Sequence, residues 1–229
     1  MTAAGSAEDT PWAYVVRRAP ASAILGYLLA CWQDYEQHYS GIGVPLAART
    51  EPQLTEALGA YLLQRQETGD QPFDGEFYAE LNRVDLAPDG KRIVVSRSDI
   101  EWRLYGSPNF VVEFKVIGNG RPAKAYVEDG MARFVAGRYG QRSAEGAMWA
   151  FFRPGSAEVV THVEALIDAN LVALRCEAED SVYRIAPSTL APSVARFDSV
   201  HARDPDCPRI RLAHLFVSIA PHPGPAEPV

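Results

Sequence analysis

The chain has 229 residues, of which 47% are hydrophobic and 22% are charged, a composition typical of a soluble globular protein with a sizeable core. The net charge of −7 argues against a protein that binds nucleic acid over its whole surface. The most apolar run near the start, residues 20–31, is too short to span a bilayer and lacks a cleavage site, so we expect a cytoplasmic protein with no membrane association. The three cysteines and five histidines show no metal-ligand spacing.

The charges are distributed unevenly along the chain. Residues 91–142 contain ten Lys and Arg against five Asp and Glu, a local balance of +5, whereas the remainder carries −12. Positive charge concentrated in one segment is typical of a phosphate-binding groove, although a solvated helix face also collects it.

The first elements are two helices. We expect a disordered leader over residues 1–10, a single domain over residues 11–219 that begins with a helical extension (11–45), and a disordered Pro-rich tail over 220–229. Apolar residues recurring every three and four positions predict a helix over residues 21–39. The sequence Thr50-Glu-Pro-Gln53 is a capping box and predicts a second helix that ends near Glu67.

Strands follow. Residues 76–85 predict the first strand, Asp89-Gly90 a tight hairpin, and the run from Lys91 a second strand that carries Asp99. The sequence Tyr105-Gly-Ser-Pro-Asn109 has turn chemistry, which makes the apolar run after it a third strand, antiparallel to the second.

The remaining segments alternate between helices and strands. We expect helices over residues 123–139 and 156–170, a strand over 147–152, a hairpin of strands 171–176 and 181–185, irregular structure over 186–208 and a last strand over 209–219. His201 falls in the irregular segment and could line a groove, and His214 is expected to be a hydrogen-bonded histidine in the core or at the sheet edge. This order predicts an α/β fold, a mixed sheet flanked by helices.

A candidate metal site lies on the second and third strands. Because side chains alternate along a strand, Glu113 and Lys115 point to one face and Phe114 to the other. If Asp99 closes the second strand beside Glu113, the two carboxylates can hold a hard divalent cation, and Lys115 can orient or help to deprotonate a water. Alternatively, these are ordinary exposed strand residues.

The segments Ser98-Asp99 and Glu113-Phe114-Lys115 resemble the half-motifs of the PD-(D/E)XK nuclease superfamily, which has the restriction-endonuclease-like fold. Ser98 stands where the family usually has Pro. The resemblance covers about residues 50–219, and residues 126–139 with Gly146-Ala-Met-Trp resemble small members associated with bacterial anti-phage defence.

The resemblance implies a Mg²⁺- or Mn²⁺-dependent endonuclease that cuts DNA in preference to RNA. Asp99 and Glu113 would be the metal ligands and Lys115 a catalytic residue. In the family, a helix before the motif strands supplies a further acidic residue. Glu51 is the residue carried over to that role, with Glu80 as its rival.

Lys124, Arg133 and Arg138 are candidate contacts to nucleic-acid phosphates, although exposed helix charges would look the same. A partner protein of a defence system, or a second copy of the chain, is a further expected partner. The acidic total charge leaves a second interpretation open, a catalytically inactive nuclease-fold subunit that serves as a structural or binding module in a defence complex. A third is an unrelated fold in which Glu-x-Lys occurs by chance.

Overall fold

The computed structural model describes residues 19–40, 42–86, 92–118, 123–153, 158–178 and 182–219, and within residues 81–96 it describes the strand backbone alone. A seven-stranded mixed sheet forms the centre, in the order β1-β2-β3-β4-β7-β6-β5. The strands are β1 (Glu76–Leu86), β2 (Arg92–Arg103), β3 (Phe110–Ile117), β4 (Glu145–Phe152), β5 (Arg184–Ile185), β6 (Phe197–His201) and β7 (Ile210–Ser218). The pairs β3–β4 and β4–β7 are parallel, and the others are antiparallel.

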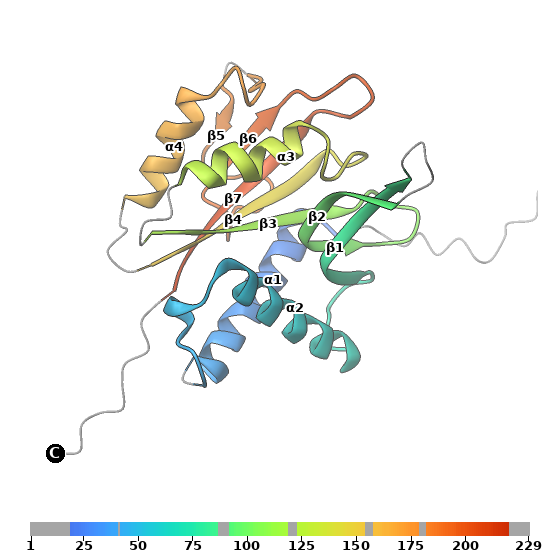
Figure 1. Ribbon diagram of the computed structural model, residues 1–229, viewed down its shortest axis with the longest axis vertical. Coiled ribbons are helices and arrows are strands. Elements are labelled where there is room, and N and C mark those ends of the chain that lie inside the picture. The colour runs from blue at the N-terminus through green and yellow to red at the C-terminus, as the bar shows by residue number, and fades with distance from the viewer. Residues whose placement is uncertain are drawn as a thin grey trace, which may run out of the picture.

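Helices cover both faces of the sheet. The α-helices are α1 (Ala21–Tyr39), α2 (Glu51–Glu67), α3 (Ala132–Val135) and α4 (Val159–Ala169), with a short 3₁₀ helix at Leu46–Ala48 and a π-helix, η2, at Tyr126–Met131. In Figure 1, α1 and α2 lie below the sheet and α3 and α4 lie above it. The sequence prediction of a mixed sheet flanked by helices is therefore confirmed.

The two first helices form as their sequence patterns predict. The apolar positions of α1 that recur every three and four residues are buried, among them Leu28 and Trp32. The capping box at the start of α2 is present, and the Thr50 N–H donates to Gln53 Oε1 at 2.8 Å. Both helices pack into one hydrophobic cluster with the lower face of the sheet.

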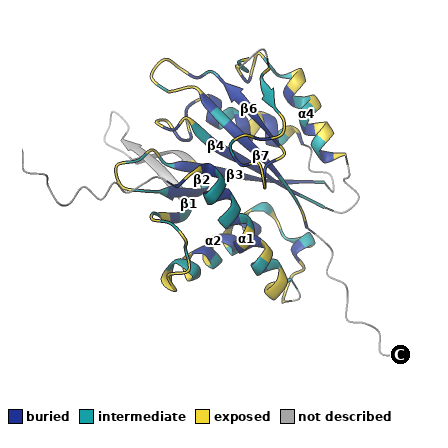
Figure 2. Cartoon of the chain, turned by 180° about the vertical axis from the view of Figure 1, so that it is seen from behind, coloured by how far each residue is buried: buried dark blue, intermediate teal, exposed yellow. Residues whose placement is uncertain are grey.

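Strands β3, β4 and β6 are buried along almost their whole length, and Figure 2 shows the central strands in dark blue. In β3, Val112, Phe114 and Val116 belong to the lower cluster with α1 and α2. Val111 and Ile117 belong to the upper cluster with η2, α3 and α4. The expected alternation in β3 is therefore confirmed, and it directs the intervening Glu113 and Lys115 to the upper face.

The helix expected over residues 123–139 differs from the structure. A π-helix occupies Tyr126–Met131 and is followed by one short α-helix, which ends at Val135. Gly130 packs closely against β4, because an added Cβ would lie 2.5 Å from Met148 Cε and the Met148 side chain would have to shift. Gly137 has a φ of +68°, a conformation that ends the helix there.

The expected hairpin of residues 171–176 and 181–185 is wrong, and so is the irregular segment 186–208. Residues 170–175 form turns, β5 has two residues, and β6 lies within the segment expected to be irregular. All five residues of β6 are buried. The Asp198 carboxylate accepts hydrogen bonds from residues 188–190, so a polar strand is satisfied inside the protein.

His201 is fully buried in β6 and lines no groove, which corrects the expectation for it. Its Nε2 and the Nε2 of His214 both lie 2.7 Å from Ser199 Oγ, and His214 Nδ1 lies 2.8 Å from the Tyr126 hydroxyl. The prediction of His214 as a hydrogen-bonded core residue is confirmed. Burial lowers the pKa of His201 to about 4, so this ring is neutral near pH 7.

Some predictions fall outside the described residues: the leader and the first part of the helical extension, the Asp89-Gly90 hairpin, and the tail over residues 220–229. Across the described part of the chain, none of the helices has both the length and the apolar character needed to cross a membrane.

Candidate active site

The site lies where β2 and β3 separate. Their antiparallel ladder pairs Ile100 with Val112 and continues toward the turn, so Asp99 and Glu113 occupy the next register position. There, Asp99 Oδ2 accepts a hydrogen bond of 2.7 Å from the Phe114 N–H. Because β2 continues to Arg103, the expectation that Asp99 closes its strand is wrong. Its carboxylate nevertheless contacts the backbone of the Glu-x-Lys segment.

Lys115 is the centre of the site. Its side chain is 9% exposed, and Nζ donates to Glu113 Oε1 at 2.7 Å, Glu51 Oε1 at 2.9 Å and the Phe114 carbonyl at 2.8 Å. Burial acts to lower the pKa of Lys115, but the carboxylates of Glu113 and Glu51 outweigh it, so the pKa is raised. The ammonium is thus charged, held by three acceptors and fixed in direction.

Glu113 is fully buried, and its two oxygens differ. Oε1 accepts from Lys115 Nζ and from Arg133 Nη1, the latter at 2.8 Å. Oε2 is buried and has no hydrogen-bond partner among the described residues. Since a buried carboxylate oxygen without a partner is costly, Oε2 is the atom at which a bound cation would gain most.

The environment of the site changes the pKa of Asp99 strongly. Burial, and then repulsion by the Glu113 carboxylate, raises the pKa of Asp99 to about 8. A positive ion bound beside Asp99 would offset the burial and the repulsion that disfavour the charged form of this carboxyl. The pair therefore has the chemistry of a cation site.

Arg133 reaches the site from α3. Its guanidinium bonds Glu113 Oε1, and the same Nη1 donates to the Tyr139 hydroxyl at 2.8 Å. Tyr139 in turn donates to the backbone carbonyl of Arg97 on β2. The sequence predicted Arg133 as a phosphate contact. The structure places it on a site carboxylate, with 39% of its side chain exposed.

Of the two rival acidic residues, the structure brings Glu51 to the site. Glu51 is the first residue of α2, and its Oε2 accepts from the Val116 N–H at 3.2 Å while Oε1 bonds Lys115. Glu80 has a φ of +53° and forms an ion pair with Arg97.

The other two predicted phosphate contacts lie elsewhere. Lys124 is exposed and pairs with Glu128 one helical turn away, at 3.3 Å. Arg138 is exposed in the turn after α3.

Sequence reasoning missed a second buried carboxylate on the same face of β2. Glu101 is 1% exposed and accepts from Arg103 Nε at 3.1 Å, Ser98 Oγ at 3.2 Å and Asn109 Nδ2. Side chains two residues apart lie on the same face of a strand, so this alternation could have predicted that Glu101 shares the face of Asp99. Glu101 ties the β2–β3 turn to the strand that carries Asp99.

The residues present fit a magnesium-type site of low protein ligand number. In the described ranges, no three His, Cys, Asp or Glu side chains stand together as a metal-binding group. Mg²⁺ is commonly bound through one or two carboxylates, with waters and substrate phosphates completing its shell. Asp99 and the unpartnered Glu113 Oε2 match that mode.

Comparison of the chain with protein-family models, with curated proteins and with solved structures finds no match. The assignment of a function to this α/β protein therefore depends on the geometry of the site.

Proposed function

We propose that the protein is a metal-dependent phosphodiesterase, an endonuclease of the restriction-endonuclease-like class that cuts DNA in preference to RNA. The observation that carries the proposal is a buried Glu113 oxygen without a partner, placed beside Asp99 where two strands separate and next to a charged Lys115. A cytoplasmic role as an effector of bacterial anti-phage defence is part of the same proposal and rests on the sequence resemblance.

Asp99 and Glu113 would hold Mg²⁺ or Mn²⁺. The bound ion would supply neutralisation of charge on the scissile phosphate and a water of lowered pKa. Lys115 offsets negative charge on the phosphate, and it would orient the attacking water by releasing one of its three present acceptors. Glu51 is the positioning residue that fixes the Lys115 ammonium. Arg133 donates to Glu113 Oε1, which leaves Oε2 without a partner in the described part of the chain and able to bind the ion.

The charge of the site supports this chemistry. Three carboxylates, Asp99, Glu51 and Glu113, face two cations, Lys115 and Arg133, and leave one net negative charge when Asp99 is ionised. A divalent cation would convert this to one net positive charge, which complements a phosphodiester. Without the ion, the site has no net positive charge to attract a phosphate at this position.

The test is cleavage of supercoiled, linear and single-stranded DNA and of RNA, with Mg²⁺ or Mn²⁺ and with EDTA. The variants Asp99→Asn and Glu113→Gln keep side-chain size and remove one charge each. Glu128→Gln is the matched control, because that carboxylate is exposed and pairs with Lys124 on the surface of η2. We expect metal-dependent cutting that falls by about 100-fold or more in both site variants and stays unchanged in the control.

A wild-type chain that cuts none of these substrates and shows no Mn²⁺ binding by calorimetry would refute the nuclease. It would support the second candidate, a non-catalytic binding module. One observation favours that candidate: each of the three Lys115 donors and Glu113 Oε1 already has a partner within the chain. Such a cluster could hold α2, β3 and α3 together for structural reasons.

A further inference from the structure

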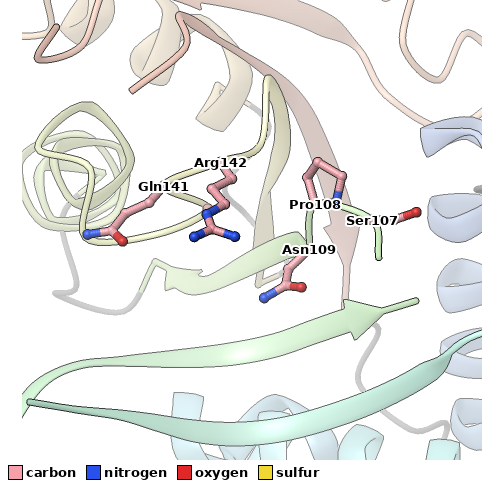
Figure 3. A pocket seen from close by; sticks show the side chains of 6 residues that line it. Ser107, Pro108, Asn109, Gln141 and Arg142 are labelled. Atoms are coloured by element: carbon pink, nitrogen blue, oxygen red, sulfur yellow. The ribbon is translucent and has the colours of Figure 1, made fainter. Parts of the chain in front are cut away.

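A pocket lies between the β2–β3 turn and the loop that follows α3. It has a volume of about 320 Å³ and is lined by Ser107, Pro108 and Asn109 on one side and Gly140, Gln141 and Arg142 on the other. Figure 3 shows Arg142 with its guanidinium between Gln141 and Asn109. Small-ligand sites span roughly 300–1,000 Å³, so there is room for a phosphodiester group with its sugar.

Arg142 is available for a ligand. It is exposed, and its guanidinium has no hydrogen bond or ion pair with any described residue. A free guanidinium offers five donors in a planar fork that matches the oxygens of a phosphate.

A second arginine holds the loop that carries Arg142. Arg203 is 8% exposed and has no carboxylate partner among the described residues. It donates instead to backbone carbonyls on the loop and beside it, those of Tyr139, Gly140, Gln141, Ser143 and Pro208. These bonds fix the loop, and the buried charge, which no carboxylate offsets, adds positive potential behind the pocket.

The opposite wall of the pocket, formed by the β2–β3 turn, is hydrogen-bonded to the strand that carries Asp99. The Asn109 amide donates to Glu101, and Arg103 offsets the charge of that carboxylate. Glu101 follows Asp99 by two residues on the same face of β2, a separation of about 7 Å along the strand. The Asn109–Glu101 hydrogen bond therefore links this wall of the pocket to the strand that carries Asp99.

We propose that this pocket binds a backbone phosphate of a DNA strand whose scissile phosphate lies at the carboxylate pair. The inference rests on the proposed function, because it takes the DNA to be the substrate. Arg142 contacts the phosphate, and Arg203 is the positioning residue that presents the loop. The contact reads no base and therefore strengthens binding equally for all sequences.

The test measures DNA affinity of the full-length chain in EDTA, by anisotropy of a fluorescein-labelled duplex at salt concentrations between about 50 and 200 mM. Arg142→Ala should weaken binding about tenfold and lower the slope of log affinity against log salt by about 0.9. Arg142→Lys should keep most of the slope. The control is Arg196→Ala, which removes the same charge from an exposed residue just before β6, beyond β4 and β7 from the site.

An affinity and slope for Arg142→Ala equal to those of Arg196→Ala would overturn the inference, as would absence of DNA binding by the wild type. Inorganic phosphate is titrated in parallel by thermal shift. Stabilisation by phosphate that Arg142→Ala abolishes, without loss of DNA affinity, would assign the pocket to a free anion and also overturn it.

Cleavage assays separate this inference from the proposed function. DNA binding that depends on Arg142, in a chain that cuts nothing with Mg²⁺ or Mn²⁺, would keep the phosphate pocket and refute the nuclease. Metal-dependent cleavage by the wild type, together with unchanged DNA affinity in Arg142→Ala, would support the nuclease and refute the phosphate pocket.

Discussion

Replacing Asp99 by Asn should stabilise the metal-free protein at alkaline pH. The amide keeps the acceptor that receives the Phe114 N–H and removes the charge that Glu113 repels. The native pKa of Asp99 is about 8, against 3.8 for the unperturbed group. Between these values the native state holds a proton that the unfolded chain has released. Stability therefore falls as the pH rises from about 4 to about 8, and the full cost is present above pH 8.

The magnitude follows from the size of the shift. A difference of about four pH units, at about 1.4 kcal/mol per unit, corresponds to about 6 kcal/mol above pH 8. If water enters the space between β2 and β3 when the Asp99 carboxylate ionises, the loss of folding free energy is about 3 kcal/mol. We therefore expect Asp99→Asn to exceed the wild type by about 3 to 6 kcal/mol at pH 8.5 without metal.

The assay is urea unfolding in EDTA from pH 6.5 to 8.5. This window excludes the main titration of buried His201, whose pKa lies at 6.5 in the unfolded chain and about 4 in the native one. The wild type should lose up to about 1.4 kcal/mol per pH unit relative to Asp99→Asn until pH 8. Mg²⁺ at about 100 times its dissociation constant should return about 2.7 kcal/mol to the wild type and little to the variant.

Parallel stability curves for the wild type and Asp99→Asn across this window would refute the reasoning. They would show that Asp99 ionises as freely in the native state as in the unfolded chain. The repulsion from Glu113, on which the cation site depends, would then be absent.

Three further outcomes follow from the buried groups. Lys115→Met should cost about 3–5 kcal/mol in urea unfolding because it leaves carboxylates uncompensated. Lys124→Met, which breaks an exposed pair, should stay within about 0.5 kcal/mol, and equal losses would contradict the buried ion pairs. The neutral native state of His201 predicts that its contribution to stability falls by up to about 1.4 kcal/mol per unit as the pH drops from 6.5 toward 4; acid unfolding of the wild type and a His201→Gln variant should diverge over that range. Gly59→Ala should lower the melting temperature at a cost of about 1–3 kcal/mol, because the added Cβ collides with β1, whereas Gly26→Ala, with nothing within 4 Å, should not destabilise.

Much of the fold could be predicted because it follows from local chemistry. The period of α1, the capping box at Thr50 and the turn around Gly106 each depend on residues a few positions apart. Alternation along β3 likewise placed Glu113 and Lys115 on one face. The residues proposed for the site could be predicted from the sequence for the same reason.

The segments that were predicted wrongly depend on distant partners. Strand β6 is polar in sequence, and Asp198 is satisfied by a loop eight to ten residues away. The π-helix contains Gly130, which packs against Met148 of β4 on the upper face of the sheet. Arg203 supports a loop about sixty residues earlier in the chain. These contacts cannot be predicted from hydrophobic periodicity or from turn residues, because both patterns are local.

The sequence alone determined that a carboxylate pair and a lysine stand on neighbouring strands, because side-chain alternation and turn chemistry are local properties. Only the tertiary structure decided that Glu51 rather than Glu80 joins Lys115, and that Arg133 lies on Glu113 instead of on the surface. Those outcomes depend on where α2 and α3 dock against the sheet. Docking is a balance of packing and charge over the whole molecule, which no short segment of the chain encodes.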